Sequence, residues 1–266
     1  MIQIFGATVS SYVWVVRMVC VEKRVPYELV PAGLHSEEIY AIHPFGKMPV
    51  LRHGDIRLCE SKAIATYIDK AFPGPKLIPE DARGAAEVEQ WVSLVNTAID
   101  PCMIRTYVLA HLVAKGANGQ PDPAVVDGAL PTMQEQIDVL DRTVARTGYL
   151  AGDGFSLADI NLLPVLHYVQ QCPEGIDMVR SARSLSDYFA RHSERPSFQS
   201  TKPQPHTVEE TAAVGKLAAA KLAAAKLTER SARVRLQKAG SRNDRAGSGA
   251  VKLRTPVSYV SLGKRC

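Results

Sequence analysis

The sequence has no paired-cysteine motif. Its five cysteines are an odd number, and no two of them are spaced as in C-x-x-C. This count and spacing speak against a disulfide framework, a zinc site and a dithiol redox centre. Cys20 and Cys59 lie inside apolar runs, which predicts that both are core thiols.

Long apolar runs and nucleotide-binding motifs are absent as well. No stretch reaches the roughly 18 apolar residues of a membrane span, and residues 1–5 are too short and uncharged for a signal peptide. We therefore expect a cytoplasmic protein without a membrane span. There is no P-loop, dinucleotide fingerprint or cluster of metal ligands, so we expect no nucleotide cofactor and no metal.

The sequence does contain enough apolar material for two domains. Of its 266 residues, 46% are hydrophobic and 22% are charged, as in an ordinary globular protein. The formal net charge of +5 is unevenly placed. Residues 201–266 hold 14 lysines and arginines against 4 acidic residues, whereas residues 1–200 hold 18 against 23. The positive charge therefore belongs to the C-terminal tail.

Residues 1–74 alternate strand and helix signals, which predicts an α/β domain. Strands are expected at residues 2–5, 27–30 and 56–59 and in the short run after Pro49, and helices at residues 11–23, 37–42 and 62–72. This order is a βαβ unit followed by ββα. Prolines before and within residues 75–82 predict a stiff linker.

Residues 83–205 show only helical patterns and predict an all-helical second domain, with long helices over residues 84–114 and 124–146. The clearest local signal is Ser156, which is placed to cap a helix while Asp159 reaches back to the Ser156 N–H as a capping box. Asp159 could be mistaken for a general base, but its spacing from Ser156 predicts a structural cap.

The composition changes beyond residue 205, where KLAAA occurs at residues 216–220 and again at 221–225. The leucines of this repeat do not stay on one helical face, so we expect residues 206–266 to be disordered or loosely helical, without a packed core. One interpretation of the tail is a basic arm for nucleic acid or anionic membrane. The other, which we favour, is an extension without a selected function, and we expect no nucleic-acid partner.

The most informative segment is the run HPFGKMPVL at residues 43–51, followed by Glu60 and Ser61. Pro49 lacks an N–H and precedes a short apolar run, which fits a bend entering a strand. Met48 is biased toward an extended backbone, which leaves its N–H and C=O able to pair with an extended ligand. Glu60 and Ser61 begin a helical run whose unpaired N–H groups favour a carboxylate. The pattern predicts a peptide-like, acidic ligand.

In the order and spacing of these segments the chain resembles the glutathione transferase superfamily over about residues 1–200. The resemblance rests on the segments at residues 2–6, 10–23, 25–28, 43–51 and 60–69. It implies a glutathione transferase fold, in which a thioredoxin-like α/β domain precedes an all-α domain, with a cis peptide before Pro49 and a homodimer. Within the superfamily, the chain is similar to bacterial, serine-type members of the phi, theta and zeta kind.

The resemblance implies a detoxifying glutathione S-transferase, with glutathione as cosubstrate and a small apolar electrophile as second substrate. A free thiol titrates at about 8.5, so the protein must stabilise the thiolate. Ser10, Ser11 and Tyr12 begin the first helix, where a hydroxyl and the positive helix end act together. The plant-type serine class places the thiol donor at Ser10, the cysteine-using class favours Ser11, and Tyr12 is a third candidate. The alternative is an N-cap role for the serines without any ligand.

For glutathione binding, the resemblance maps the cysteinyl part onto the backbone of Met48 and the γ-glutamyl group onto Glu60 and Ser61. Lys47 stands where it could meet the glycyl carboxylate, and His35 is a weaker candidate for the same role. Each of these assignments is implied by the resemblance alone.

The electrophile is expected between the two domains, against side chains from both: Tyr12, Trp14, Met103 and Tyr107. Met103 and Tyr107 would fit a core role equally well. Two other functions share the glutathione site: a glutathione-dependent isomerase or dehalogenase, and a glutathione- or ligand-binding protein without turnover. Tyr12 stands where the zeta-type isomerases have cysteine, which speaks against the isomerase.

Overall fold

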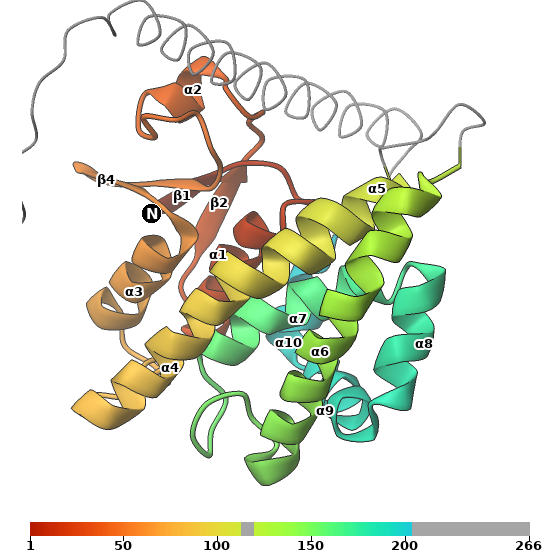
Figure 1. Ribbon diagram of the computed structural model, residues 1–266. Coiled ribbons are helices and arrows are strands. Elements are labelled where there is room, and N and C mark those ends of the chain that lie inside the picture. Colours follow the sequence, from red (N-terminus) through yellow and green to blue (C-terminus); the bar gives the residue numbers. More distant parts are fainter. Residues whose placement is uncertain (113–119, 204–266) are drawn as a thin grey trace, which may run out of the picture. The chain divides into compact units, whose positions relative to one another are not determined.

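The computed structural model describes residues 1–112 and 120–203. The described residues all belong to one compact unit of the chain. Figure 1 shows an α/β part in red and orange followed by a helical part in yellow to blue. The predictions made for the tail, residues 206–266, lie outside the described residues.

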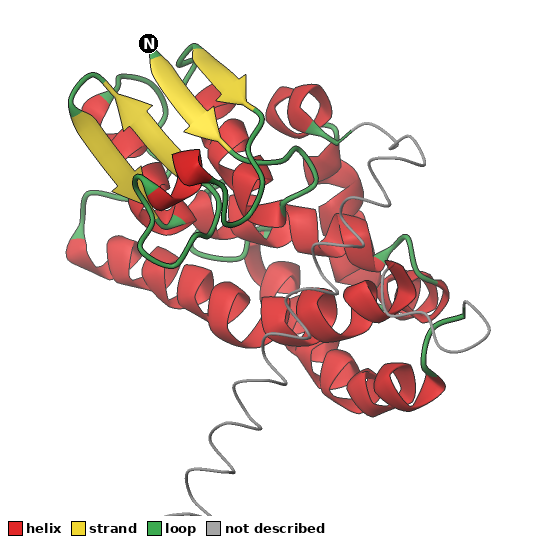
Figure 2. Cartoon of the chain, turned by 90° about the horizontal axis from the view of Figure 1, so that it is seen from above, coloured by secondary structure: helices red, strands yellow, loops and turns green. Residues whose placement is uncertain are grey.

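The α/β part confirms the thioredoxin-like order expected from the sequence. Its elements are β1 (Ile2–Phe5), α1 (Ser11–Glu22), β2 (Tyr27–Val30), α2 (Glu37–Tyr40), β3 (Val50–His53), β4 (Ile56–Cys59) and α3 (Ser61–Ala71). The strands form one sheet in the order β2-β1-β3-β4. β1 is parallel to β2 and antiparallel to β3, which is antiparallel to β4. Figure 2 shows the strands gathered at one end, with helices filling the rest.

The hairpin between β3 and β4 sets their register. His53 pairs with Ile56, so the turn is the two residues Gly54 and Asp55. Gly54 has φ +60°, a left-handed conformation that glycine adopts without cost. Because the turn is short, the other end of β4 is fixed opposite the start of β3.

The helical part contains the remaining elements: α4 (Ala82–Leu94), η1 (Val95–Val108), α5 (Leu109–Leu112), α6 (Pro123–Thr147), α7 (Leu157–Val169), α8 (Pro173–Ser181), α9 (Arg183–Ser193) and α10 (Pro196–Thr201). Among these described helices, none is long and apolar enough to cross a membrane. α6 confirms the helix expected over residues 124–146.

The other long helix differs from the prediction, because the 14 residues of η1 between α4 and α5 are π-helical. The Leu109 N–H donates to the C=O of Ile104, five residues back, in addition to nearer carbonyls. Pro101 lies inside η1 and has no N–H, so it cannot complete an α-helical ladder at this point. Side chains five residues apart, rather than four, therefore lie next to each other along η1.

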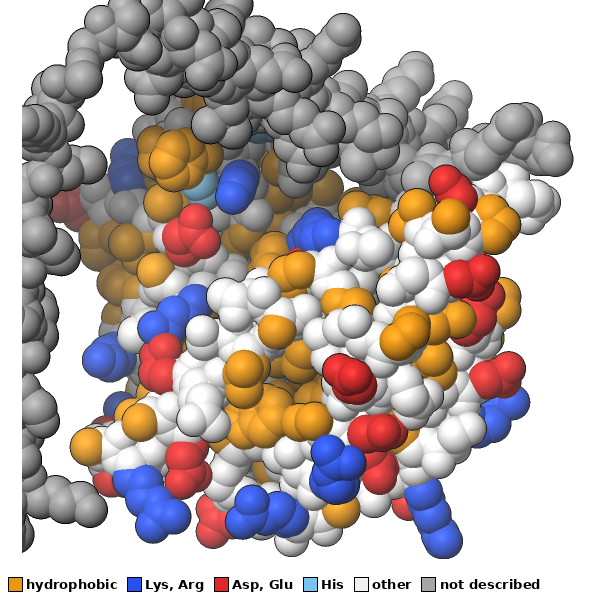
Figure 3. Space-filling view, viewed as in Figure 1, with side chains coloured by type: hydrophobic (Ala, Val, Ile, Leu, Met, Phe, Trp, Pro, Cys, Tyr) orange, Lys and Arg blue, Asp and Glu red, His pale blue; other side chains and the backbone are white. Residues whose placement is uncertain are grey.

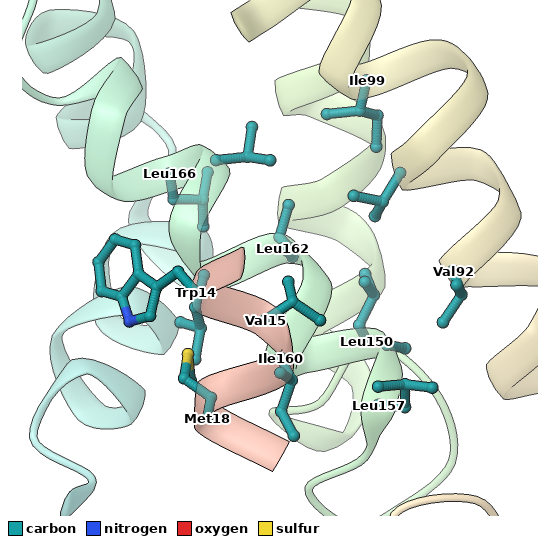
Figure 4. Close-up of a cluster of buried hydrophobic side chains, with 14 of the residues drawn as sticks. Trp14, Val15, Met18, Val92, Ile99, Leu150, Leu157, Ile160, Leu162 and Leu166 are labelled. Carbon is teal, nitrogen blue, oxygen red and sulfur yellow. The ribbon is translucent and has the colours of Figure 1, made fainter. Parts of the chain in front are cut away.

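α1 is the helix that both parts of the fold share. Eight of its 12 residues are buried, and it packs against α3 as well as against α7 and α10. Figure 4 shows Trp14, Val15 and Met18 of α1 among the apolar side chains of α7. Full burial of a large apolar side chain contributes about 1.5–3 kcal/mol, so α1 contributes strongly to the stability of this core.

A buried ion pair ties the linker to the ends of α1 and α3. Lys23 Nζ donates to Asp69 Oδ1 at 3.1 Å, to the Asp69 C=O at 3.0 Å and to the Pro75 C=O at 3.0 Å. Asp69 also accepts the N–H of Leu77 at 2.9 Å and of Ile78 at 3.3 Å. All three ammonium hydrogens have partners, which offsets the cost of burying the charge.

The predicted capping box at the start of α7 is confirmed. The Ser156 N–H donates to Asp159 Oδ2 at 2.8 Å, and the Ser156 side chain caps the helix in return. Asp159 is fully buried and also accepts the Leu150 N–H at 2.8 Å and the Tyr188 hydroxyl at 2.9 Å. Burial raises the pKa of Asp159, and these hydrogen bonds oppose that rise. The carboxylate serves the fold, as its spacing predicts.

Candidate functional site

The sheet brings three chain segments to one of its ends. Phe5, at the end of β1, lies opposite Val50, at the start of β3, and Val50 lies opposite Cys59, at the end of β4. The loop after β1, the bend before β3 and the residue after β4 must therefore be neighbours. These are the segments that contain Ser10, Pro49 and Glu60.

The bend before β3 contains the cis peptide that the family resemblance implies, between Met48 and Pro49. Met48 Sδ accepts the N–H of Ala7, in the loop after β1, at 3.3 Å. A Cβ added to Gly6 would lie 3.4 Å from Met48 Cβ and closer still to Val13, so the loop fits here only with glycine. Met48 and the loop leading to Ser10 are thus in direct contact.

Ser10 is the N-cap of α1, and Ser11 is the first residue of the helix. Ser10 Oγ is half-buried and accepts the Val13 N–H at 3.4 Å. A serine hydroxyl that accepts one hydrogen bond still carries its own O–H, and no acceptor for it is found among the described residues. Ser11 is only 6% exposed. Of the two serines, Ser10 is the one with a hydroxyl accessible at the helix end.

The helical part holds the same loop from the other side. The Tyr168 hydroxyl of α7 donates to the Val9 C=O at 2.8 Å, and the Ser10 N–H donates to the Ala7 C=O at 3.1 Å. Burial raises the pKa of Tyr168 far above its usual value, so it stays a neutral donor. The position of Ser10 therefore depends on both parts of the fold.

Glu60 and Ser61 lie at the start of α3, as predicted. Glu60 is the N-cap residue and has φ +67°, an uncommon backbone conformation for a side chain of this size. Its side chain makes no capping hydrogen bond to α3 and is 70% exposed. Ser61 is buried at 7% exposure. Glu60 thus directly precedes the residues whose N–H groups begin α3.

His43 is a residue of this site that the sequence prediction missed. Its ring is buried, Nδ1 accepts the Phe45 N–H at 3.0 Å, and Nε2 lies 3.2 Å from Glu60 Oε1. His43 is the first residue of the run HPFGKMPVL, but the sequence does not show that residue 43 reaches residue 60.

His35 and Lys47 lie on the loop that crosses the end of the sheet, and both are exposed. The His35 N–H donates to the Gly46 C=O at 2.9 Å, and His35 Nδ1 lies 2.9 Å from the Tyr40 hydroxyl. Gly46 has φ +63°, and a Cβ there would collide with the rings of His35 and Tyr40. The turn places His35 beside the residue that precedes Lys47.

Tyr12 projects from α1 toward η1, where it meets two further residues absent from the sequence prediction. Arg105 lies with Cζ 5.3 Å from the centre of the Tyr12 ring. Asp100, nearly fully buried, accepts Arg105 Nε at 2.8 Å and Nη2 at 3.3 Å. Burial raises the pKa of Tyr12 to about 12, and the nearby Asp100 charge adds to the rise while Arg105 opposes it. Asp100 and Arg105 are five residues apart, a spacing that aligns side chains only in a π-helix.

The structure corrects the expected electrophile pocket at three positions. Trp14, Met103 and Tyr107 have no exposed surface. Trp14 Nε1 donates to Thr201 Oγ1 at 2.8 Å, and the Tyr107 hydroxyl donates to Glu174 Oε2 at 2.8 Å. Their polar groups are paired with structural partners, which is how buried Trp and Tyr are stabilised. These three side chains belong to the core, and of the expected set only Tyr12 keeps accessible surface.

Within residues 1–112 and 120–203, no three of the His, Cys, Asp and Glu side chains cluster as a metal site would require. The chemistry available here is that of a hydroxyl at one helix end, a carboxylate at another, and the backbone of Met48 in the bend before β3.

Comparison with known proteins gives relatives over most of the described chain. Residues 4–76 match the family model of the glutathione S-transferase N-terminal domain, and residues 92–196 match that of the C-terminal domain. Glutathione S-transferase 3 of Zea mays is 34% identical over 209 residues, which are 75% of this chain and 92% of that protein.

Solved structures agree with this match. A crystal structure of a glutathione transferase from Populus trichocarpa is 29% identical with a TM-score of 0.69, covering 76% of this chain and 97% of that one. A structure of glutathione S-transferase I bound with lactoylglutathione is 26% identical with a TM-score of 0.68, covering 75% and 97%.

Proposed function

This chain belongs to the glutathione S-transferase family, and we propose that its Ser10 activates the glutathione thiol. The chain has the transferase activity of that family: the sulfur of glutathione attacks an electrophilic carbon and forms a C–S bond. The thiol proton passes to solvent, and the leaving group or the π system of the electrophile takes up the electron pair.

The serine-type mechanism is supported by the magnitudes that the site can supply. Lowering a thiol pKa of about 8.5 by about two units corresponds to roughly 2.7 kcal/mol. A hydrogen bond to a charged group contributes about 1.5–3 kcal/mol, and a helix N-terminus about 0.3–1 kcal/mol. The Ser10 hydroxyl at the start of α1 offers both, so one serine is sufficient for this task.

The peptide part of glutathione is proposed to lie along the end of the sheet. The backbone N–H and C=O of Met48, beside Pro49, pair with the cysteinyl residue, as an added strand pairs with a sheet edge. The α-ammonium of the γ-glutamyl group binds the Glu60 carboxylate, and its α-carboxylate binds the N–H groups at Ser61. The exposed cation of Lys47, with His35 near it, is the proposed partner of the glycyl carboxylate.

The apolar electrophile is proposed to lie against Tyr12, on the side of α1 that faces η1. The ring of Tyr12 stays neutral at physiological pH, because burial raises its pKa to about 12. Asp100 compensates the charge of Arg105, so this side of the site presents little net charge to an apolar substrate.

A homodimer is proposed from the family and from the surface of the helical part. Figure 3 shows hydrophobic side chains gathered between α4 and α6. Leu94 of α4 and Val139 of α6 are 40% and 45% exposed. Apolar surface of this kind is often covered by a partner.

A cytoplasmic location, expected from the sequence, stays a prediction.

The observation that carries the proposal is the position of the Ser10 hydroxyl at the α1 N-terminus, in the loop that contacts Met48. The test is the ultraviolet absorbance of the bound glutathione thiolate, titrated with pH and paired with turnover of an aryl halide. We expect the bound thiol to titrate about two units below free glutathione. Bound glutathione that titrates like the free thiol would contradict activation and leave only a binding protein.

A further inference from the structure

His43 lies buried beside the proposed γ-glutamyl site, and both its ring and its backbone make hydrogen bonds. Its Nδ1 accepts the Phe45 N–H at 3.0 Å, and its Nε2 lies 3.2 Å from Glu60 Oε1. Its own N–H donates to the Ile39 C=O at 2.8 Å, and its C=O accepts the Gly46 N–H at 3.0 Å. The side chain is 3% exposed. The ring therefore has a single orientation with respect to Glu60.

These contacts define the tautomer of the ring. A nitrogen that accepts a backbone N–H carries no hydrogen, so in the neutral imidazole the hydrogen lies on Nε2. Nε2 is therefore the donor and Glu60 Oε1 the acceptor. The bond joins a rigid buried donor to an exposed carboxylate.

Glu60 has no other contact that would fix its carboxylate. It does not cap α3, its side chain is 70% exposed, and the bond from His43 is the one hydrogen bond to this carboxylate among residues 1–112 and 120–203. The bond occupies Oε1 and leaves Oε2 available for a cationic ligand. A long side chain held by one bond is ordered before a ligand arrives.

We propose that His43 is a positioning residue, whose Nε2–H orients the Glu60 carboxylate to receive the α-ammonium of glutathione. This inference rests on the proposed role of Glu60. His43 itself does not touch glutathione. It lowers the conformational entropy that Glu60 loses on binding, and immobilising one such side chain is worth about two- to tenfold in affinity.

Two amide substitutions separate the bond to Glu60 from the bond to Phe45. In His43→Asn the amide can still accept the Phe45 N–H, because Oδ1 takes the place of Nδ1, but no donor reaches Glu60. In His43→Gln the amide nitrogen takes the place of Nε2 and keeps the donor to Glu60, while the bond to Phe45 is lost. The two variants are therefore matched controls for each other.

The proposal expects His43→Asn to raise the KM for glutathione about two- to tenfold, with a smaller change in kcat, and His43→Gln to restore the KM. The opposite order, with a normal KM in His43→Asn and a raised KM in His43→Gln, would assign His43 to the loop alone and overturn the proposal.

A second probe is glutathione without its α-ammonium, glutaryl-cysteinyl-glycine. The ratio of the two substrates' KM values within one variant does not depend on the folded fraction, and in His43→Asn it should be about two- to tenfold smaller than in the wild type. An unchanged ratio in that variant would also overturn the proposal.

Glu60→Ala distinguishes this inference from the proposed function. If Glu60→Ala raises the KM and His43→Asn adds nothing to it in the double variant, both stand. If Glu60→Ala raises the KM and His43→Asn alone does not, only the inference on His43 is contradicted. If Glu60→Ala leaves the KM unchanged, the proposed γ-glutamyl site is wrong and His43 loses its role with it.

Discussion

At the residue scale, the site turns on the difference between two adjacent serines. Ser10 precedes the first turn of α1 and has an accessible hydroxyl, whereas Ser11 is inside the turn and buried. At the same helix end, therefore, one serine is half-buried and the other is buried. Both residues are serine, so the sequence alone does not show this difference, which follows from their positions on the helix.

We predict that Ser10→Ala lowers kcat at neutral pH about ten- to a hundredfold, because a charge-assisted hydrogen bond of about 1.5–3 kcal/mol is lost. The KM for glutathione should change less, since the peptide contacts lie elsewhere. Activity should partly recover as pH rises, because solvent then removes the thiol proton. The measurement is a pH series of kcat and KM.

Ser11→Ala is the matched control for that experiment and should have the smaller effect on kcat. A larger loss in Ser11→Ala than in Ser10→Ala would shift the assignment by one residue. If neither serine matters and Tyr12→Phe does, the thiol donor is the tyrosine.

At the scale of elements, α7 is the helix on which the core and the site both depend. It begins at the capping box, packs against α1, and carries Tyr168, which holds the loop before Ser10. Eleven of its 13 residues are buried. We therefore expect a substitution at either end of α7 to lower the free energy of unfolding more than it changes turnover.

The start of α7 gives a prediction on stability. Ser156→Ala should cost about 1 kcal/mol, the usual value of an N-cap. Asp159→Ala should cost more, about 3 kcal/mol, because it leaves the buried N–H groups of Leu150 and Ser156 and the hydroxyl of Tyr188 without an acceptor. Urea unfolding measures both. Equal losses in the two variants would contradict the central role given to the carboxylate.

The end of α7 gives a prediction on pH. Burial, followed by the charge of Lys202, lowers the pKa of His167 to about 4, against about 6.5 in an unfolded chain. Below pH 6.5 the unfolded chain binds a proton that the folded chain does not. Stability from this residue is therefore complete above pH 6.5 and is lost as the pH falls toward 4, by up to about 1.4 kcal/mol per unit.

His167→Phe tests this assignment, since a phenyl ring can keep the edge contacts that His167 makes with Trp14 and Phe198 at 5.0 and 5.8 Å between ring centres. Unfolding free energies from pH 7 to pH 4 should fall less steeply in the variant than in the wild type. Some slope should remain, because burial also lowers the pKa of His192. Parallel curves would show that His167 is not a source of the acid sensitivity.

At the scale of the whole molecule, α10 completes the core. Thr201 is buried and accepts Trp14 Nε1–H at 2.8 Å, and Phe198 lies 4.8 Å from the Trp14 ring between centres. Arg195, just before α10, donates to Glu22 of α1 at 2.9 Å through both Nε and Nη2. The chain therefore returns to α1 in its last described helix.

We predict that a chain ending at Pro205 stays folded and keeps turnover within about twofold, because the buried contacts of α1 are complete by Thr201. The control is a chain ending at Glu194, which lacks α10 and exposes Trp14. It should lose several kcal/mol, in line with the removal of a buried aromatic contact surface. Thermal unfolding and turnover measure both chains, and insoluble protein from the first truncation alone would contradict the prediction.

Much of this arrangement could be predicted from local sequence patterns. The strands at Ile2–Phe5 and Tyr27–Val30, the capping box at Ser156 and the bend at Pro49 are local features, because periodicity, capping and proline act over a few residues. The π-helical η1 could not be predicted, because an α-helical pattern does not reveal a register of five. The sequence does not decide between a core and a pocket position for Met103 and Tyr107, because apolar side chains fit both.

The sequence by itself determined most of the elements that form, and it predicts an acidic, peptide-like ligand at the loop around Met48 and the start of α3. The tertiary structure alone decided which side chains meet there. His43 reaches Glu60, and Arg105 reaches Tyr12, only because the sheet register and the packing of η1 on the first part bring distant segments into contact. Such contacts depend on how far apart two elements lie in space. A sequence pattern gives only the spacing of residues along the chain.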